Sequence, residues 1–232
     1  MRVGSVLGLT RYPVKSVGGE SLQQVEVTPR GLVGDRVWAV YTDDGFIGSG
    51  KSSYRFRHVE GLLTVRARLS GERPVVELPD GTTGLAGDPD TDRRLSDLLG
   101  RPLTVRPETT VSHHDASPLH LVTTASLRRL EQQLGEPVDV RRLRPNLVLD
   151  VPGADFVEDG WRGRELAVGE HVVLALGPAM ERCAMVNAAQ RGLAHESRLL
   201  KLISREHDLE LGLQVSVVRP GPLALGDPAH LT

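Results

Sequence analysis

The sequence predicts a mainly β fold, namely a β-barrel with a few short helices, built as two fused β-rich parts. Glycine and proline account for 25 and 15 of the 232 residues, whereas only 3% of the residues are aromatic. Such a composition is typical of many short strands joined by tight turns. Apolar and polar residues alternate with the period of a strand over much of the chain, and helical spacing is confined to short segments. We therefore expect roughly ten strands and three short helices in a closed or nearly closed barrel.

In the first part of the chain, residues 1–106, strand patterns dominate. Alternating or apolar runs predict strands at residues 2–9, 21–27, 37–41, 62–69 and 75–78. Glycine, proline and aspartate between these runs supply the turns. The one helix expected here covers residues 92–99, because its leucines share one face and Gly100 follows.

The second part, residues 107–232, begins with a polar stretch and mixes strands with two helices. Thr123 or Thr124 is expected to cap a helix over residues 125–134, and a second helix is expected over residues 197–205. Strands are expected at residues 138–149, 165–168, 171–176 and 213–218.

The composition excludes several classes of protein. A single cysteine rules out a disulfide within the chain, a zinc site made only of cysteines and an iron–sulfur cluster held by this chain alone. The formal net charge of −2 provides no basic field for nucleic acid. No run approaches the roughly 18 apolar residues of a membrane span, so we expect a cytoplasmic protein that does not cross a membrane. The common phosphate-binding, zinc-protease and nucleophile-elbow patterns are absent.

The single cysteine, Cys183, has two interpretations. It follows an expected strand end and adjoins Arg182, whose positive charge could stabilise a thiolate. Free cysteines are also among the most buried residue types, so a packing role is the alternative. His113 and His114 are expected in a polar loop rather than a metal or hydrolase site, because adjacent side chains on a strand point in opposite directions.

Three further segments carry polar groups that suit an anion. Lysine is scarce, so Lys15 beside Ser16 suggests a role for a compact charge. Arg36 follows a Gly–Asp turn that can present backbone N–H groups to an anion. Arg144 and Asn146 flank a proline and suit forked recognition of a phosphate or the edge of a heterocycle. A structural role stays open for each: a solvated lysine, an Asp–Arg turn, or the outer face of an edge strand.

In sequence order, these segments resemble the MOSC domain proteins, a family named after the C-terminal domain of molybdenum cofactor sulfurase. The two-part form, that of the mitochondrial amidoxime-reducing component and its bacterial relatives, is the most similar. Two segments resemble the N-terminal β-barrel part of that form: Tyr-Pro-Val-Lys-Ser at residues 12–16 and Gly-Leu-Val-Gly-Asp-Arg-Val-Trp at residues 31–38. Four later segments resemble the MOSC part of that form, namely residues 118–127, 144–146, 156–161 and 182–183.

The resemblance implies a fold, a cofactor and a set of site residues. The fold is the MOSC β-barrel, which is similar to the barrel of pyruvate kinase, preceded by the N-terminal β-barrel part. The implied cofactor is the pterin-based molybdenum cofactor, with Cys183 as the catalytic residue and the protein ligand of the metal. The residues implied to hold its phosphate and pterin are Lys15, Ser16, Arg36, Thr123, Thr124, Ser126, Arg144, Asn146 and Arg182. Pyridoxal phosphate is not expected, because nothing here resembles the sulfurase domain that binds it.

The activity implied is that of a molybdenum-dependent oxidoreductase that reduces small N-hydroxylated molecules such as hydroxylamines and amidoximes. Because the chain has one cysteine, electrons are expected from separate flavin or iron–sulfur proteins. One alternative is a carrier whose Cys183 holds a persulfide or the cofactor without turnover, and another is a scaffold that has lost the cofactor. Glu181 departs from the family pattern, which has a small polar residue there, so its carboxylate is expected either to face solvent or to alter the pocket.

Overall fold

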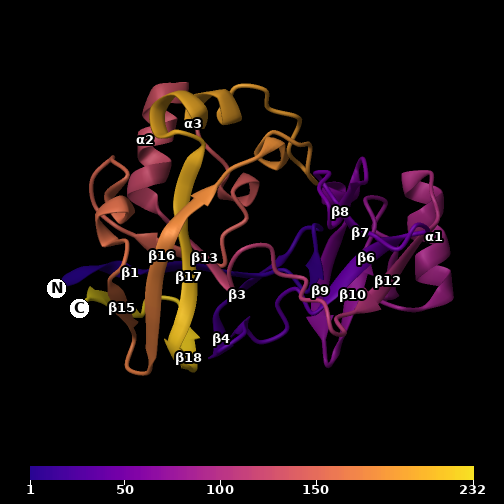
Figure 1. Ribbon diagram of the computed structural model, residues 1–232, viewed down its shortest axis with the longest axis horizontal. Helices are drawn as coiled ribbons and strands as arrows, with labels where there is room; N and C mark the ends of the chain where they lie inside the picture. Colours follow the sequence, from indigo (N-terminus) through magenta and orange to yellow (C-terminus); the bar gives the residue numbers. More distant parts are fainter.

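The computed structural model describes all 232 residues, and Figure 1 shows two β lobes lying side by side. The strands of the chain are β1 (Arg2–Arg11), β2 (Val14–Lys15), β3 (Glu20–Leu22), β4 (Gln24–Thr28), β5 (Gly31–Leu32), β6 (Trp38–Thr42), β7 (Ile47–Ser49), β8 (Phe56–His58), β9 (Arg66–Ser70), β10 (Arg73–Glu77), β11 (Thr83–Leu85), β12 (Leu103–Pro107), β13 (Leu119–Thr123), β14 (Leu147–Asp150), β15 (Glu165–Val168), β16 (Val172–Glu181), β17 (Glu210–Arg219), β18 (Gly221–Ala224) and β19 (Pro228–Leu231). The helices are α1 (Pro89–Leu99), α2 (Thr124–Leu134) and α3 (Leu199–His207), with short 3-10 turns η1 (Leu62–Thr64), η2 (Val140–Arg142), η3 (Val157–Trp161) and η4 (Ala184–Val186).

The larger lobe is a closed barrel, which confirms the predicted fold class. Its strand order is β14-β13-β17-β16-β15-β19-β1, and antiparallel pairing of β1 with β14 closes the ring. In that pair Leu9 lies opposite Leu147. Closure leaves no free edge on these seven strands, which is how a barrel avoids unwanted strand pairing. Helices α2 and α3 lie against each other at the top of the barrel in Figure 1.

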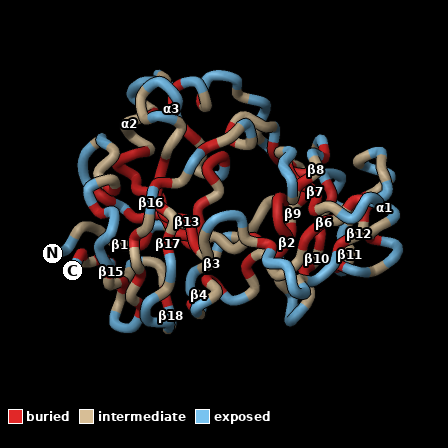
Figure 2. The backbone as a smooth tube through the Cα atoms, viewed as in Figure 1, coloured by how far each residue is buried: buried red, intermediate tan, exposed pale blue.

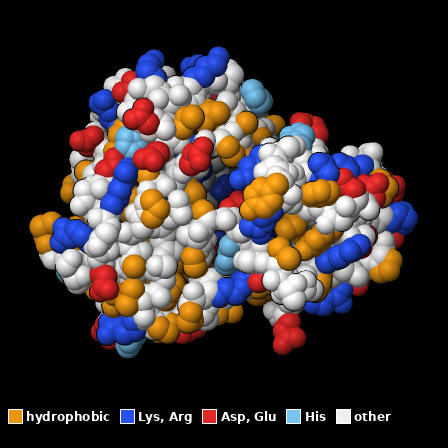
Figure 3. Space-filling view, in the orientation of Figure 1, with side chains coloured by type: hydrophobic (Ala, Val, Ile, Leu, Met, Phe, Trp, Pro, Cys, Tyr) orange, Lys and Arg blue, Asp and Glu red, His pale blue; other side chains and the backbone are white.

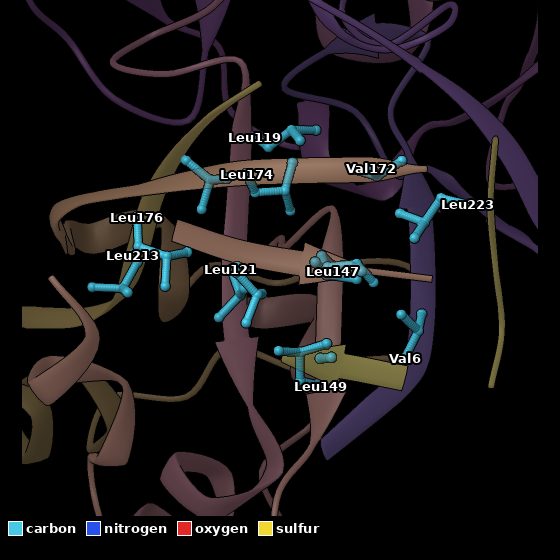
Figure 4. Packing of buried hydrophobic residues seen from close by; sticks show 14 of the residues in the cluster. Val6, Leu119, Leu121, Leu147, Leu149, Val172, Leu174, Leu176, Leu213 and Leu223 are labelled. Carbon is cyan, nitrogen blue, oxygen red and sulfur yellow. The ribbon is translucent and has the colours of Figure 1, made fainter. Parts of the chain in front are cut away.

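The interior of the barrel is a single apolar core. It comprises 21 buried residues, including Leu121, Leu147, Leu174 and Leu213, which come from four different strands. Figure 4 shows these side chains gathered in one interior. Burying each such leucine contributes about 1.5–3 kcal/mol, so inward alternation along the strands is the main force that shapes this lobe.

The barrel is built from both ends of the sequence. Strand β1 supplies one wall, β3 extends the sheet beside β1, and β4 pairs with β18 from the far end of the chain. The amino group of Met1 donates a hydrogen bond to the Leu231 carbonyl oxygen at 2.6 Å. The expected boundary between the two parts of the chain, at residues 106 and 107, stays a prediction. Strands β1 and β4, which precede it, pair with β14, β19 and β18, which follow it.

The smaller lobe packs two short sheets and one helix around a second core. One sheet has the order β12-β6-β7-β8 with β2 parallel to β6, and the other has the order β11-β10-β9. Helix α1 contacts β11 and β12 and inserts the fully buried Leu95. Figure 2 shows buried stretches in both lobes. No helix in the structure is both long enough and apolar enough to cross a membrane.

Two predicted strands were wrong over part of their length. Within residues 62–69, η1 comes first and only residues 66 onward belong to strand β9, because Gly61 at φ +74° starts a tight turn. Within residues 138–149, Asp139 caps η2 by accepting a hydrogen bond from the Arg141 backbone N–H, and only the last residues enter β14. Alternating apolar residues in these segments reflect burial and not extended backbone.

Candidate functional site

A cavity of about 260 Å³ lies beside Cys183 and is lined from both lobes. Its polar lining consists of Arg36, Lys51, Asp115, Ser117, His120, Arg142, Arg144, Asn146, Glu181, Arg182 and Gln214. Figure 3 shows a hollow between the lobes with Lys or Arg side chains inside it. Four of the residues expected from the sequence, Arg36, Arg144, Asn146 and Arg182, therefore meet at Cys183 although they come from distant segments.

Cys183 lies where β16 ends and η4 begins. Its side chain is half-buried, and its carbonyl oxygen accepts a hydrogen bond from the Val186 N–H at 3.1 Å. The preceding Arg182 N–H donates to the Leu209 carbonyl oxygen at 2.6 Å. These bonds anchor the backbone on both sides of the thiol, so the sulfur lies at a fixed place on the cavity wall.

Arg182 brings a buried positive charge next to the thiol. Its side chain is only 9% exposed, and Nη2 donates to the Leu143 carbonyl oxygen at 2.6 Å. Its Nε is buried without a partner. Burial lowers the pKa of Arg182 to about 10, and the Cys183 sulfur opposes that shift, so the guanidinium stays charged at neutral pH.

His120 forms part of the cavity floor beside Arg182. The two side chains approach at 3.4 Å between His120 Nε2 and Arg182 Nη1. Burial, and then the charge of Arg182, hold the pKa of His120 well below its usual range. The imidazole is therefore neutral at pH 7, and the positive charge of the cavity comes from lysine and arginine alone.

Arg36 contacts both Asp35 and Asn146. Asp35 is fully buried, accepts a hydrogen bond from the Tyr12 backbone N–H at 2.7 Å and forms an ion pair with Arg36. Burial raises the pKa of Asp35, but Arg36 and further donors lower it more, so this carboxylate stays ionised. Arg36 Nη1 also donates to Asn146 Oδ1 at 3.2 Å, and Asn146 Nδ2 donates to the Thr10 carbonyl oxygen at 3.1 Å.

The backbone is strained at this site. Only five non-glycine residues have positive φ, and three of them are expected site residues: Ser16 at +63°, Arg36 at +52° and Arg144 at +54°. The other two, Asp208 and Leu209, form the turn whose carbonyl oxygen holds the Arg182 backbone. Left-handed backbone at a residue with a side chain is unfavourable by roughly 1–2 kcal/mol, and such strain concentrates at functional sites.

Lys15 and Ser16 support the cavity from behind its lining. Lys15 is 3% exposed, and its Nζ lies 3.0 Å from Asp115 Oδ1 and 4.5 Å from the centre of the Phe56 ring. Burial lowers the pKa of Lys15 to about 8, although Asp115 opposes the shift. Ser16 Oγ donates to Ser49 Oγ at 3.2 Å. Neither residue lines the cavity: Lys15 contacts the lining residue Asp115, and Ser49, the partner of Ser16, contacts the lining residue Met185.

The structure brings Thr123, Thr124 and Ser126 to a different place. The Thr123 and Ser126 hydroxyls each donate to the buried Glu158 carboxylate at 2.7 Å, and Thr124 Oγ1 donates to Asp150 Oδ1 at 3.0 Å. None of the three lines the Cys183 cavity. Their expected contact with a cofactor stays a prediction: in the structure the Thr123 hydroxyl caps α2 by accepting from the Ser126 backbone N–H, and the Thr123 and Ser126 hydroxyls solvate a buried carboxylate.

Several lining residues were missed by the sequence reasoning. Lys51, Asp115 and Ser117 lie on loops without a distinctive pattern, and only folding brings them to the cavity. Met185 joins the two lobes, since Ser49 Oγ lies 3.9 Å from its sulfur. Scarcity was the one available signal for Lys51, because it is one of three lysines.

Two further expectations concern residues near the site. Glu181 is exposed at the rim of the cavity and forms no ion pair, so its carboxylate faces solvent. His113 lies in the loop between β12 and β13, as expected, but is fully buried; its Nε2 lies 2.9 Å from the Tyr41 hydroxyl and its Nδ1 lies 3.1 Å from the Arg36 carbonyl oxygen. His113 therefore supports the strained backbone of Arg36.

A closed β-barrel, a second β lobe and a basic cavity with one thiol define the class: a two-lobed β protein that presents a cysteine sulfur beside a group of arginines. The MOSC domain profile matches residues 108–230, and that of the MOSC N-terminal beta barrel domain matches residues 3–94. The chain belongs to the MOSC domain family.

Curated relatives and a solved structure extend this assignment. Mitochondrial amidoxime-reducing component 1 of Mus musculus is 24% identical over 286 residues, which cover 99% of this chain and 83% of that protein. Molybdenum cofactor sulfurase of Oryza sativa subsp. japonica is 25% identical over 231 residues, which cover 77% of this chain but 28% of the sulfurase. The crystal structure of the YUAD protein from Bacillus subtilis has a TM-score of 0.56 at 12% identity, covering 99% of this chain and 95% of that one, and shows the same fold.

Proposed function

We propose that this protein is a molybdenum-cofactor-dependent oxidoreductase that reduces N-hydroxylated small molecules with electrons from separate flavin or iron–sulfur proteins. The observation that carries the proposal is the half-buried thiol of Cys183 on a cavity wall that also presents Arg36, Arg144 and Arg182. Relatives named for amidoxime reduction and for molybdenum cofactor sulfuration support the same cofactor class.

The residues present fit a polyanionic pterin cofactor. Arg182 Nε is a buried donor without a partner, and Arg144 has no carboxylate within 4.0 Å, so both have hydrogen-bonding capacity to spare. Arg36, Arg144 and Asn146 would hold the phosphate and the pterin edge by charge-assisted and forked hydrogen bonds. Cys183 would be the protein ligand to the metal, since thiolate suits such a centre.

When bound, the cofactor supplies two-electron redox chemistry at its metal. In the proposed reaction an R–NH–OH substrate takes up two electrons and two protons, its N–O bond breaks, and R–NH₂ and water leave. Arg182 keeps its charge beside the Cys183 sulfur, and neutral His120 adds no further positive charge there. Met185 lines the cavity beside Cys183 and contacts Ser49 across the lobes.

The test is to purify the protein from a host that makes the cofactor and to measure molybdenum together with pterin fluorescence. We expect metal and pterin in the wild type, loss of metal in Cys183→Ser, and no change in Ala184→Ser, a matched substitution at the exposed neighbouring residue. The loaded protein should then reduce an amidoxime with a strong artificial electron donor. A wild type without cofactor contradicts the proposal.

A carrier role is the second candidate, favoured by the match to molybdenum cofactor sulfurases over 77% of this chain. In that case Cys183 would hold the cofactor or a persulfide without turnover. Molybdenum in the protein without reduction of either an amidoxime or a hydroxylamine would favour the carrier. Mass spectrometry of the only cysteine would then detect a persulfide.

A further inference from the structure

A second cavity adjoins the one at Cys183. Its volume is about 310 Å³, and Arg144 is the only residue that lines both. It is formed by the segment after β1, by β9 and by the loop that follows η4. No residue assigned to the cofactor other than Arg144 takes part, so the second cavity has a chemistry of its own.

The carboxylates of this second cavity are already neutralised. Glu77 accepts from Arg191 Nη1 at 2.5 Å, and Glu20 pairs with Arg11 at 2.9 Å. Neither carboxylate has to be neutralised by a bound cation. The field inside the cavity is therefore set by the remaining arginines.

Three guanidinium groups on the wall have no acidic partner. Arg66, Arg68 and Arg144 form no ion pair within 4.0 Å, whereas Arg141 is held by Asp139 at 2.6 Å. Arg66 and Arg144 are half-buried and Arg68 is exposed. Unpaired guanidinium groups converging on one cavity favour a multiply charged anion, because each offers a fork of N–H donors.

A buried amide provides an independent indication of a ligand. Gln190 is 9% exposed, lines the cavity, and its Nε2 is buried without a hydrogen-bond partner. Buried polar groups are nearly always paired, so an unpaired N–H calls for an acceptor. Such an acceptor is what a phosphoryl or carboxylate oxygen provides.

The size and the lining restrict the ligand further. Only three of the fifteen lining residues are hydrophobic, so the ligand is polar over most of its surface. A cavity of about 310 Å³ exceeds the roughly 30 Å³ that one water occupies by about tenfold, and is larger than a bare phosphate requires.

We propose that this cavity binds a small phosphorylated molecule, with its phosphoryl group held by Arg66, Arg68 and Arg144 and a further oxygen accepting from Gln190 Nε2. The site shares Arg144 with the function proposed for the Cys183 cavity and is otherwise independent of that function. Because Arg144 lines both cavities, an anion in the second cavity also changes the charge available at the first.

Pyrophosphate is the probe for this site, titrated calorimetrically into the purified full-length chain. We expect saturable binding to the wild type and about tenfold weaker binding in Arg66→Gln and in Arg68→Gln, which is the effect of losing one hydrogen bond to a charged group. Neither side chain has a partner in the protein, so both variants should unfold at the wild-type temperature. Lys51→Gln, which changes only the Cys183 cavity, and Arg2→Gln, at an exposed strand residue, should bind pyrophosphate like the wild type.

Three results would overturn the proposal. The first is no binding to the wild type. The second is weakening by Lys51→Gln but not by Arg66→Gln, which would place the anion in the Cys183 cavity. The third is equal weakening by all four variants, which would indicate a non-specific charge effect. Succinate tests the chemical class: if it binds through the same arginines more tightly than pyrophosphate, the ligand is a dicarboxylate and the phosphorylated class is wrong.

Discussion

The guanidinium carbon of Arg144 lies 4.3 Å from the centre of the Tyr12 ring, and the Tyr12 hydroxyl donates to the Pro145 carbonyl oxygen at 3.2 Å. This stacked pair connects the segment after β1 with the loop before β14. Its cation–π energy is about 0.5–2 kcal/mol. Arg144 also has a left-handed backbone, so the same residue lines the cavity and carries backbone strain.

Arg144 allows the strain to be measured. Arg144→Gly and Arg144→Ala both remove the guanidinium, but only glycine adopts φ +54° without steric penalty. After allowance for the greater freedom of unfolded glycine, we expect the glycine variant to be more stable by about 1 kcal/mol. Urea denaturation of the two proteins measures the difference. An alanine variant of equal or greater stability would show that the backbone there is not strained.

Lys15 should make stability depend on pH. Its folded-state pKa of about 8 lies below the ordinary value of 10.5, so the folded protein binds fewer protons than the unfolded chain between these values. Stability from this group therefore rises with pH in that window. Relative to Lys15→Met, the wild type should gain on the order of 2 kcal/mol between about pH 7.5 and 9.5. A difference that stays constant over this range would refute the lowered pKa.

Ser126 tests whether the hydroxyls near Glu158 stabilise its buried carboxylate. Ser126→Ala removes a donor to a buried carboxylate and should lower the free energy of unfolding by about 1–3 kcal/mol, while molybdenum content per folded protein stays at the wild-type level. In a Glu158→Gln background the same change should be milder, because no charge is left without a donor. Equal losses in both backgrounds, or loss of metal, would argue against this role.

Met185 should control access to the thiol. In cofactor-free protein, Met185→Ala removes the contact with Ser49 across the lobes, so Cys183 should react severalfold faster with a disulfide reagent. The readout is unambiguous because the chain has one cysteine. Leu98→Ala, at an exposed residue of α1, is the matched control. An unchanged rate in Met185→Ala would mean that access is limited elsewhere.

The strand-rich fold was predictable because its signal is local. Period-two alternation and glycine or proline turns gave the barrel class, and leucine spacing with Gly100 or Gly135 gave helices close to α1 and α2. The strand predicted over residues 138–149 was wrong in its first part, because Asp139 caps η2 and Pro145 follows before β14 begins. The closure of the barrel by β1 has no local signal at all.

The site could be predicted only where residues carried unusual chemistry. Cys183, Arg36 and Arg144 stood out by type and by their turn context, and the structure brings them to one cavity. Thr123 and Ser126 have the same hydroxyl chemistry as anion-binding residues, and only the position of Glu158 shows what they do. Hydrogen-bond capacity is visible in a sequence, whereas the partner that uses it is not.

The pairing of β1 with both β14 and β19 has a consequence for biogenesis. Strand β1 leaves the ribosome long before β14 and β19, so the ring cannot close until those strands have followed. Until then, strands with unpaired edges are exposed to other nascent chains. A circular permutant that joins the neighbouring termini (Figure 1) and opens an exposed loop of the smaller lobe would make β19 and β1 consecutive, and should refold faster with less aggregation.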